Sequence, residues 1–571
     1  MHWTINHTLK STTAAARRQE IMSELFTRLG LKSKSAITHY LKPASPLTLN
    51  AAAAGLNQSH LHQAVRLIKS AIKHQSLVII YGDYDADGVC ATAILWESLH
   101  ALGAQAYPFI PSRKRHGYGL SVKGIRDALS LYQSSIINHK PLIITVDNGI
   151  TAHTAAKSLA NQGIPLIITD HHQPGKTLPP HQALVHTDRL SGAGIAWFLV
   201  KALVQTDPGS LLSQTLDLVT IGTVADMMPL VGVNRSLVKS GLIAISQTTR
   251  PGLKALLQTA GLEPGSQLST YHLNFMIAPR LNAAGRLENA MDSLRLLCTH
   301  HQARAQQLAT QLNQTNLTRQ DLTQTLVDQA VSSVTPEPGP LIFIAADSFH
   351  EGVIGLVAGK LTETFYRPAI VVSRHQEISK ASARSIKGVN IIELIRTHEA
   401  MLLNAGGHPM AAGFTIQTAS IQSFKEAIIA TAAQTIDPAL FDPNLDIDCL
   451  IELKDITQAL FQDLQSLKPF GLGNREPVFA LRGVQPFSRR LVGKTGNHLK
   501  LTFKLPGGQI LSAIGFGFGS NSHPGGGEKR QRLVSPGVKS IAPLDLAFTL
   551  QENTFNGRTS LQLLLKDIQH S

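Results

Sequence analysis

Cysteine is scarce in this chain of 571 residues. Its three cysteines, Cys90, Cys298 and Cys449, are an odd number, lie far apart and form no Cys-x-x-Cys pair. This pattern excludes a disulfide framework and a common structural zinc site, and it favours a reducing compartment. Long apolar runs are also missing: no stretch approaches the roughly 20 residues that span a bilayer, and the start has no apolar signal segment. We therefore expect a cytoplasmic protein that does not enter a membrane.

Acidic residues are few relative to basic ones. The chain has 38 Asp and Glu against 52 Lys and Arg, which gives a formal net charge of +14 and a pI near 9.6. Such an excess favours a polyanionic partner, either a nucleic acid or an anionic membrane surface. Hydrophobic residues make up 43% of the chain, and its length exceeds one ordinary core. The composition predicts a globular protein of three or four domains.

Three short apolar runs in the first half of the chain each end in acidic residues. Residues 77–80 precede YGDYDADG, residues 142–146 precede DNG, and residues 166–169 precede DHH. Helix-like stretches separate the runs, which is typical of buried parallel strands in a doubly wound α/β layer. Because ligands gather at the carboxyl ends of such strands, we expect the acidic residues to meet at one edge of the sheet.

The rest of the sequence predicts further parts. Residues 301–332 have the spaced apolar positions of a long connecting helix, which PEPGP at 336–340 ends. A second α/β unit follows, and short alternating strands with Gly-rich turns then predict a small β-barrel. The predicted domains are an N-terminal helical segment that packs on the catalytic domain (1–75), the catalytic domain with the parallel sheet (76–300), the connecting helix (301–335), a second α/β domain (336–440) and the barrel (445–571).

The acidic residues suit divalent cations. Carboxylates packed together repel one another unless cations compensate, and oxygen ligands with one or two imidazoles favour Mg²⁺ or Mn²⁺. Two such ions about 3.5–4 Å apart can activate water and stabilise the leaving oxygen in phosphoester hydrolysis. The side chains that follow the three strands, or that interrupt a later apolar run, are Asp83, Asp85, Asp87, Asp147, Asp170, His171, His172 and Asp226.

Two other interpretations apply to these acids. A single Asp after a strand is more often a helix N-cap or a turn residue than a ligand, and Asp83 in particular can be structural. DYDADG also opens like the Ca²⁺ loop of an EF-hand. Ile94, however, stands at the twelfth loop position, where that loop needs Glu. The sequence therefore excludes an EF-hand.

Four motifs in order carry a family resemblance. YGDYDADG, VDNG, TDHH and GTVADMMPL resemble the signature motifs of the DHH phosphoesterases, and SARSIKG and GGHPMAAGF resemble the DHHA1 substrate-binding domain. PFGLGNREPVF at 469–479 and the terminal barrel, which is similar to an OB-fold, narrow the resemblance to the RecJ family of single-strand-specific 5′→3′ DNA exonucleases. The resemblance spans roughly residues 40–571.

The resemblance implies roles for the acidic residues. Two Mn²⁺ or Mg²⁺ ions would be bound, with Asp147 as a bridge between them, and His172 would contact the scissile phosphate or complete a metal shell. Tyr81 stands where some relatives have His, so one ligand would be absent. The implied catalytic residues are Asp85, Asp87, Asp147, His171, His172 and Asp226, all of them metal ligands except His172.

Three other regions are candidates for substrate binding. RKRHGYGL (113–120) combines cations with a tyrosine that can stack any base, and the alternative is a solvated basic loop. PRLNAAGR (279–286) would line the same cleft, or would pair with acids such as Glu288. In SARSIKG and GGHPMAAG, Arg and the exposed N–H groups of Gly-rich turns suit phosphate, although a lone His at a turn is usually structural. The candidate substrate-binding residues are Arg113, Tyr118, Arg280, Asn282, Arg286, Ser382, Arg384, Gly407 and His408.

The barrel adds candidates for binding the DNA backbone. HPGGGEKRQRLVSPG (523–537) predicts a flexible basic loop within it. Basic side chains on its predicted strands suit phosphates, although each suits a solvated β surface equally well. These residues are Arg489, Arg490, Lys494, His498 and Lys500.

Together these features predict a metal-dependent exonuclease that degrades single-stranded DNA from its 5′ end and releases 5′ mononucleotides during recombination and repair. The family implies a single-strand-binding protein and a helicase as partners, and we expect a monomer. Two alternatives remain: a DHH phosphodiesterase for oligoribonucleotides or cyclic dinucleotides, and a non-catalytic DNA-binding scaffold. The barrel and connecting helix argue against the first, and the acids in all four motifs argue against the second.

Overall fold

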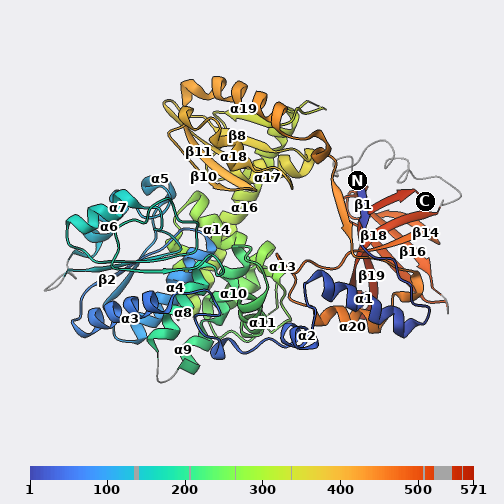
Figure 1. The fold of residues 1–571 in the computed structure, drawn as a ribbon, viewed down its shortest axis with the longest axis horizontal. Helices are drawn as coiled ribbons and strands as arrows, with labels where there is room; N and C mark the ends of the chain where they lie inside the picture. Colours follow the sequence, from blue (N-terminus) through green and yellow to red (C-terminus); the bar gives the residue numbers. More distant parts are fainter. Residues whose placement is uncertain are drawn as a thin grey trace. The chain divides into compact units, whose positions relative to one another are not determined.

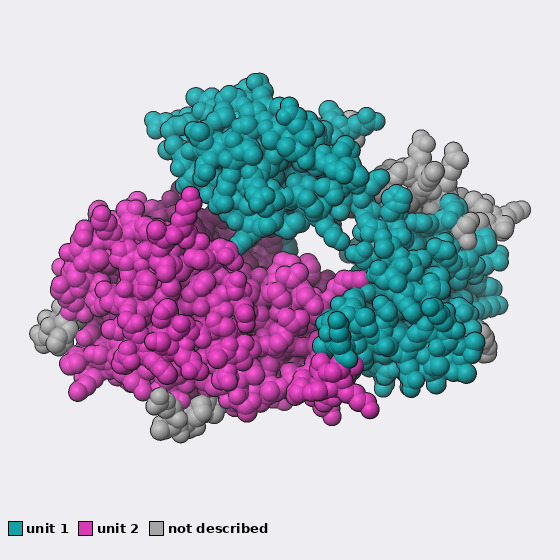
Figure 2. Space-filling view, viewed as in Figure 1, with its two compact units in different colours: residues 1–32, 320–467, 476–571 teal, residues 33–319, 468–475 magenta. Residues whose placement is uncertain are grey.

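The computed structural model describes residues 1–133, 140–204, 208–263, 265–335, 337–505, 508–519, 543–555 and 557–570. The predicted basic loop at 523–537 lies outside these described residues. The chain divides into two compact units (Figures 1 and 2). Unit 1 comprises residues 1–32, 320–467 and 476–571, and unit 2 comprises residues 33–319 and 468–475. No helix among the described residues is long and apolar enough to cross a membrane.

A parallel sheet of five strands forms the centre of unit 2. Its strands are β2 (Val78–Tyr81), β3 (Ala106–Phe109), β4 (Leu142–Val146), β5 (Leu166–Asp170) and β6 (Ala183–His186). They lie in the order β3-β2-β4-β5-β6, and every neighbouring pair is parallel. The strands β2, β4 and β5 are buried along their whole length, as expected for apolar runs that are covered on both faces.

Helices cover both faces of this sheet (Figure 1). On one face α3, α4, α8 and α10 contribute to a large apolar core, and on the other α6 and α7 pack against the strands. The helices of unit 2 are α2 (Lys34–Leu41), α3 (Gln58–Lys73), α4 (Ala86–Ala101), α5 (Arg113–His116), α6 (Val122–Leu131), α7 (His153–Asn161), α8 (Gly192–Leu203), α9 (Pro208–Gln214), α10 (Leu216–Ala225), α11 (Gly232–Ser246), α12 (Pro251–Thr259), α13 (Thr270–His272), α14 (Ala278–Leu287) and α15 (Met291–Cys298), with the 3₁₀ turn η1 (Pro46–Thr48) and the π-helical turn η3 (Leu273–Ile277). The long helix α16 (Gln302–Ser332) contributes residues to both units.

Unit 1 contains a second α/β fold. Its five-stranded sheet has the order β10-β11-β9-β8-β7, in which only β7 and β8 run parallel. The strands are β7 (Ile342–Ala346), β8 (Ala369–Ser373), β9 (Ile378–Arg384), β10 (Asn404–His408) and β11 (Ala411–Gln417). The helices are α17 (Ile354–Phe365), α18 (Ile391–Arg396) and α19 (Ile421–Thr435), with the 3₁₀ turns η4 (Glu399–Met401), η5 (Thr418–Ser420) and η6 (Pro438–Phe441).

The barrel follows in the same unit. Its seven strands are hydrogen-bonded in the order β13-β14-β18-β19-β17-β16-β15, and β16 alternates buried and partly exposed residues, which is the pattern of a strand with one face on a core. The strands are β13 (Cys449–Leu450), β14 (Phe479–Val484), β15 (Ser488–Val492), β16 (His498–Lys504), β17 (Ile510–Gly515), β18 (Leu544–Phe555) and β19 (Arg558–His570). The remaining elements of unit 1 are β1 (His2–Ile5), α1 (Ala14–Arg28), β12 (Asn444–Ile447), η7 (Leu453–Asp455) and α20 (Gln458–Ser466).

The N-terminal segment differs from the prediction. We expected residues 1–75 to pack on the catalytic domain, but residues 1–32 belong to unit 1. Strand β1 pairs in parallel with β12, and Arg17 of α1 donates two hydrogen bonds of 2.7 Å to the carboxylate of Asp455. These partners are more than 430 residues away along the chain, so local periodicity could not reveal them.

Candidate metal centre and substrate site

The carboxyl ends of β2, β4 and β5 bring acidic side chains and histidines together. Strands of a parallel sheet end at one edge, so residues that are distant in sequence converge there. Three groups have ligand atoms within 4.8 Å of one another, and shared members join them into one set, the strand-end cluster: Asp83, Asp85 and Asp147; Asp87, His171 and Asp226; and Asp147, His171 and His172.

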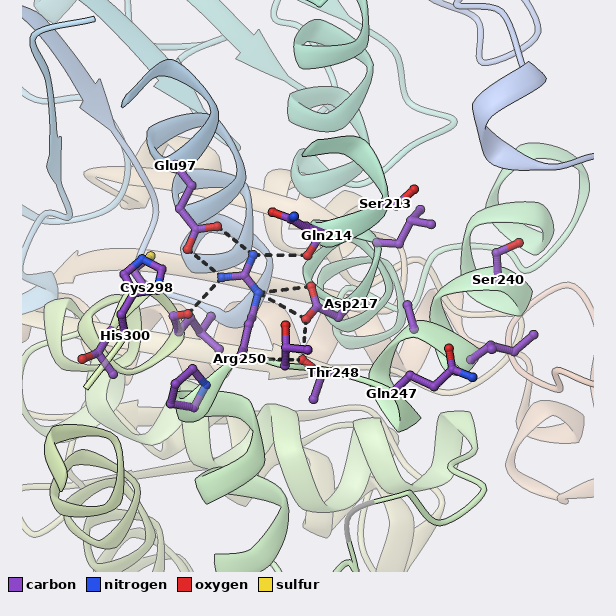
Figure 3. Close-up of a pocket in the computed structure, with 17 residues that line it drawn as sticks. Glu97, Ser213, Gln214, Asp217, Ser240, Gln247, Thr248, Arg250, Cys298 and His300 are labelled. Atoms are coloured by element: carbon purple, nitrogen blue, oxygen red, sulfur yellow. Dashed lines mark hydrogen bonds and ion pairs between the residues drawn. The ribbon is translucent and has the colours of Figure 1, made fainter. Parts of the chain in front are cut away.

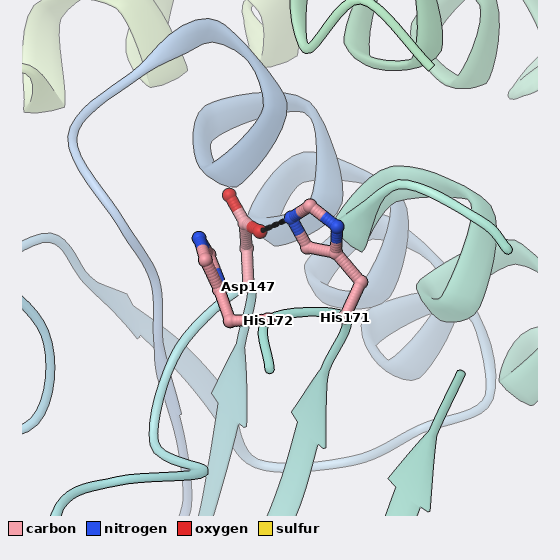
Figure 4. A group of neighbouring side chains, drawn as sticks. All are labelled: Asp147, His171 and His172. Atoms are coloured by element: carbon pink, nitrogen blue, oxygen red, sulfur yellow. Dashed lines mark ion pairs between the residues drawn. The ribbon is translucent and has the colours of Figure 1, made fainter. Parts of the chain in front are cut away.

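Asp147 links two of these groups. It follows β4 with a backbone φ of 64°, a left-handed conformation that is uncommon for residues other than Gly. The side chain is 2% exposed, and its Oδ1 accepts a hydrogen bond from none of the described residues, although Nε2 of His171 lies 3.0 Å away as an ion pair (Figure 4). A buried carboxylate oxygen without a donor is costly. The residues present therefore fit a divalent cation bound at this oxygen.

Two of the predicted ligands also bind helix amides. Asp85 is the N-cap of α4, and its Oδ1 accepts from the N–H groups of Asp87 and Gly88, both at 3.0 Å. The Asp87 carboxylate accepts from Gly192 at 2.6 Å and Ala193 at 3.0 Å, at the start of α8. The N-cap interpretation thus applies to these two residues, and it leaves Asp87 less free than Asp147 to bind a cation.

Asp83 is placed differently from the structural role that its sequence context suggested. It is 1% exposed, and it accepts a hydrogen bond of 2.7 Å from the N–H of the next residue, Tyr84. Its carboxylate also belongs to one ligand group with Asp85 and Asp147. Asp83 is therefore a candidate ligand in this structure, in addition to the ligands that the family resemblance implied.

Burial and mutual repulsion raise the pKa of most acids in the strand-end cluster. Burial, with the charge of Asp85, raises the pKa of Asp83 well above its ordinary value and that of Asp87 to about 7. Burial and the charges of Asp87 and Asp85 also raise the pKa of Asp147, and they raise that of Asp226 to about 8. These carboxylates ionise fully only when positive charge compensates them. A divalent cation would supply that charge.

A hydrogen-bonded chain of Asp170, His172 and Tyr118 borders the cluster. Nδ1 of His172 lies 2.7 Å from Oδ1 of Asp170, and Nε2 lies 3.0 Å from the hydroxyl of Tyr118. Burial lowers the pKa of His172, but the hydrogen bond and charge of Asp170 outweigh it and raise the pKa to about 9. His172 is therefore cationic at neutral pH. The sequence placed Asp170 among the acids at the strand ends, but we did not predict that it would hold His172.

The other residues of unit 2 that were predicted to bind substrate make different kinds of contact in the structure. The guanidinium of Arg113 lies 5.7 Å from the ring centre of Tyr84, an aromatic residue that the sequence interpretation missed within YGDYDADG. Oδ1 of Asn282 accepts from the N–H of Ala86 at 2.7 Å, so Asn282 positions the loop that carries the acids. Arg286 lies near enough to Tyr84 to influence its pKa. Of the five residues predicted here, Asn282 thus has a positioning role in this structure.

Arg384 at the end of β9 is a partly buried cation that forms no ion pair with a described acid. Its Nη1 donates to the backbone oxygen of Ala383 at 2.8 Å and to Oγ of Ser382 at 3.3 Å. None of the described acids forms an ion pair with it, and burial lowers its pKa. A Cβ at Gly355, near the start of α17, would lie 3.1 Å from its guanidinium. Arginine beside a helix N-terminus suits a phosphate group.

The segment with Gly407 and His408 corrects one prediction. We expected a Gly-rich turn, but the structure has β10 here, the edge strand of its sheet, paired with β11. Gly407 has φ 143°, and a Cβ there would lie 2.4 Å from the backbone oxygen of Ala411, so Gly407 is required by close strand packing. Gly406 and His408 are exposed. An exposed edge strand offers backbone groups to a ligand, as a turn would.

A cavity of about 480 Å³ elsewhere in unit 2 has a different character (Figure 3). Arg250 crosses it and donates to both carboxylate oxygens of Glu97, at 2.6 and 2.7 Å, and to Asp217 at 3.2 Å. The cavity is lined by none of the predicted site residues. Its cation is already compensated by two acids, so these residues tie α4 to α10 and α12 and offer no free charge to a ligand.

Three protein-family models match the chain. They are the DHH family, N-terminal domain, at residues 77–223, the DHHA1 domain at residues 339–434 and the RecJ OB domain at residues 447–567. Together with the strand-end cluster, they define a phosphoesterase of the DHH class and confirm the predicted α/β fold class with its OB-like barrel.

Relatives narrow the class further. Single-stranded-DNA-specific exonuclease RecJ of Thermus thermophilus is 34% identical over 515 residues, covering 89% of this chain and 71% of that protein. The Escherichia coli RecJ is 30% identical, covering 96% and 95%. The Bacillus subtilis RecJ is 34% identical over 520 residues, but this chain spans only 63% of its length. The chain belongs to the RecJ family of single-stranded-DNA-specific exonucleases.

Solved structures agree with this assignment. RecJ of Thermus thermophilus in complex with Mn²⁺ has a TM-score of 0.79 and 30% identity, covering 100% of this chain and 80% of that one. The same protein in complex with Mg²⁺ has a TM-score of 0.74 and 29% identity. Both ions are among those that the strand-end cluster suits, so the cofactor of this site is Mn²⁺ or Mg²⁺.

Proposed function

We propose that this chain hydrolyses single-stranded DNA from its 5′ end and releases 5′ mononucleotides. The observation that carries the proposal is the strand-end cluster, in which buried carboxylates with raised pKa surround an oxygen of Asp147 that lacks a donor among the described residues. Membership of the RecJ family supplies the substrate class. Neither alternative, a small oligonucleotide or cyclic-dinucleotide phosphodiesterase or a non-catalytic scaffold, is favoured by any feature of the site.

We assign the ligands from two of the groups in the strand-end cluster, one of which contains Asp147. Asp83 and Asp85 with Asp147 would hold one ion, and Asp87, His171 and Asp226 would hold the second next to it, with Asp147 between them. This assignment adds Asp83 to the predicted set. Bound Mn²⁺ or Mg²⁺ would supply charge for activating water and for stabilising the leaving oxygen. The carboxylates themselves must lose their protons before binding, because their pKa values are raised.

His172 and Tyr118 would act on the substrate itself. The imidazolium of His172 is held by Asp170, so its Nε2 carries a proton that can be donated to a phosphate oxygen in place of the Tyr118 hydroxyl. Negative charge grows on the phosphate oxygens during hydrolysis, and a fixed donor stabilises it. The exposed ring of Tyr118, with Arg113 nearby, would contact the terminal nucleotide without reading the base.

Polarity would come from unit 1. The Arg384 site, which we define as Arg384, Ser382, Gly407 and His408, would hold the 5′-terminal phosphate. A partly buried cation that forms no ion pair with a described acid is stabilised by an anion. Backbone N–H groups of the exposed strand β10 would add hydrogen bonds. A site that binds a 5′-terminal phosphate would favour strands by their 5′ end, which suits hydrolysis in the 5′→3′ direction.

The barrel would bind a longer DNA strand, and other proteins of the cell would supply such strands. Arg489, Arg490, Lys494, His498 and Lys500 would bind backbone phosphates of a longer strand. A single-strand-binding protein and a helicase would deliver such strands during recombination and repair, and the enzyme would act as a monomer. All three cysteines are buried and unpaired, which suits the reducing cytoplasm.

The decisive experiment is a nuclease assay on single-stranded oligonucleotides labelled at either end. With Mn²⁺ we expect labelled mononucleotides at once from the 5′-labelled strand and a shrinking ladder from the 3′-labelled strand. Double-stranded DNA and RNA of the same sequence are the controls for specificity. Release of label first from the 3′ end, or equal cleavage with and without a divalent cation, would contradict the proposal.

A further inference from the structure

Two adjacent aromatic rings of unit 2 face solvent. Tyr271 is 62% exposed and Phe275 is 65% exposed. Their ring centres are 4.9 Å apart and their planes are inclined at 35°. Aromatic residues make up only 5% of the chain, and they carry the largest apolar area per residue. Exposure of two such rings side by side costs free energy unless a ligand covers them.

The local fold keeps these rings on the surface. Tyr271 lies in the short helix α13 (Thr270–His272), and Phe275 lies in the π-helical turn η3, four residues later. Leu273 and Ile277, on the other side of the same turn, are completely buried. A π-helical turn is a rare element that occurs frequently at functional sites. The aliphatic side of this helical stretch therefore packs into the core, and its aromatic side remains exposed and available to bind a ligand.

Cations without acidic partners flank the rings. Arg280 donates to the backbone oxygen of Met276 at 2.6 Å and to Asn313 at 3.0 Å. Lys468 lies near enough to help lower the pKa of His272, after burial. Among the described residues no acid pairs with either Arg280 or Lys468. A surface of aromatic rings bordered by cations complements a single nucleic-acid strand better than it complements an apolar protein face.

The ring pair is close to the metal centre along one continuous helical stretch. Asn282, on the helix that follows η3, accepts from Ala86 in the loop of acidic residues. From Phe275 to Asn282 is seven residues, which corresponds to about 10 Å along a helix axis. The same helix is pressed against that loop, because a Cβ at Gly285 would lie 2.3 Å from the backbone oxygen of Tyr84.

We propose that Tyr271 and Phe275 form a base-stacking platform that holds nucleotides of the single strand beside the hydrolytic centre, with Arg280 and Lys468 at the neighbouring phosphates. The inference rests on the proposed function and adds Tyr271, Phe275 and Lys468, which the sequence analysis did not mark, to the predicted residue Arg280. Stacking accepts any base, because every base has a π-face. A platform of this kind rejects a duplex, whose bases are already stacked on each other. It would therefore contribute to single-strand selectivity.

The first test separates ring stacking from a general apolar contact. Tyr271→Leu, Phe275→Leu and the double variant keep apolar surface but remove the rings, and Tyr271→Phe keeps the ring. We expect each Leu substitution to weaken binding of a 30-nucleotide strand by roughly 10-fold, while Tyr271→Phe binds like wild type. Fluorescence anisotropy in the absence of a divalent cation measures this without hydrolysis. Ile243→Ala, an exposed apolar residue of the same unit, is the matched control.

The second test uses the DNA. Oligonucleotides with one abasic nucleotide at successive positions should show one or two positions at which wild-type binding falls by about 10-fold, and the double Leu variant should not respond to those positions. Binding of wild-type strength by the Leu variants, or an abasic profile that is unchanged by them, would overturn the platform. An inactive wild-type protein that still shows the abasic effect would refute the proposed hydrolysis and leave the platform standing.

Discussion

The strand-end cluster carries negative charge and the Arg384 site carries positive charge. In both sites the charge is not balanced by an equal opposite charge among the described residues. In the first, buried carboxylates repel one another and their pKa values are raised. In the second, the partly buried guanidinium of Arg384 has no acidic partner among the described residues, and desolvation lowers its pKa. Each arrangement is unfavourable alone and becomes favourable with a ligand of opposite charge. The difference supports the proposal that the cluster holds cations and that the Arg384 site holds an anion.

A third region shows what a compensated charge looks like. Arg250 is partly buried like Arg384, but it donates to the carboxylates of Glu97 and Asp217, and these acids raise its pKa. Arg17 and Asp455 form a similar pair in unit 1. These charges are satisfied within the fold, so they stabilise the packing of helices. The contrast supports a functional assignment for Arg384 better than its burial alone would.

We expect the largest effect when a carboxylate is removed from the strand-end cluster, which is the proposed cation site. Asp147→Asn keeps the size of the side chain but removes the charge shared by two ligand groups. We expect hydrolysis to fall by about 1,000-fold or more at saturating Mn²⁺, since metal ions supply several kcal/mol of transition-state stabilisation. DNA binding without cation should persist. Asp188→Asn, an exposed acid of the same unit, is the control, and turnover of Asp147→Asn within 10-fold of wild type would refute the role.

A substitution in the Arg384 site, the proposed anion site, should have a smaller effect, and the effect should be on KM more than on kcat. Arg384→Gln removes the charge but keeps hydrogen-bonding groups, and we expect KM for a 5′-phosphorylated strand to rise by roughly 10- to 100-fold with a smaller change in kcat. The preference for a 5′ phosphate over a 5′ hydroxyl should disappear. Arg374→Gln, an exposed arginine at the end of the neighbouring strand β8, should leave KM unchanged. An equal loss for both 5′ ends would place Arg384 outside the phosphate site.

The roles of Asp83 and Asp87 can be distinguished by the stability of their Asn variants against unfolding. Asp87→Asn places an amide group against the N–H donors of Gly192 and Ala193, so we expect the unfolding free energy of unit 2 to fall by about 1–2 kcal/mol. Asp83→Asn removes a buried charge that its neighbours repel, and it should leave the melting temperature without cation unchanged or higher. Both should lower activity in Mn²⁺. Calorimetry in chelator measures the difference, and equal melting temperatures would contradict the distinct roles.

The pH dependence of stability gives a smaller effect with a definite sign. In the folded protein without cation, Asp87 has a pKa of about 7 and Asp226 of about 8, above the value near 4 for an unfolded chain. The folded state therefore binds more protons, and stability is lost as pH rises from about 4 through 8. We expect the melting temperature in chelator to fall by several degrees from pH 5.5 to 8.5. Mn²⁺ should flatten this decline, whereas parallel curves with and without Mn²⁺ would refute it.

The smallest effect concerns the barrel. Arg490 and Lys500 are directly opposite on β15 and β16, a like-charge pair that is unfavourable in a sheet unless an anion lies across it. Replacing either by Ala should reduce the slope of log K against log salt for a long single strand by about 0.7. Lys254→Ala on α12 is the control in unit 2. An unchanged slope for both variants would mean that the pair is an ordinary solvated surface.

Local patterns in the sequence carried much of the fold. The apolar runs at 142–146 and 166–169 fall on β4 and β5, because a short β-branched run between polar turns has few alternatives to a buried strand. The convergence of Asp147 with His171 followed from the rule for parallel strand ends. The strand β10 was missed because Gly406 and Gly407 are typical of turns. Only the neighbouring strand β11 holds them extended.

Sequence alone determined the order of elements, the family and the residues that can bind cations, since these depend on local composition and on motif spacing. Tertiary structure decided which polar groups are compensated. Three contacts join residues that no motif places together: the hydrogen bonds from the start of α8 to Asp87, the pairing of β1 with β12, and the acids around Arg250. The tertiary structure also leaves the ring pair of Tyr271 and Phe275 exposed to solvent. Burial and partner identity are properties of packed chains, and the free energy of a charge depends on both.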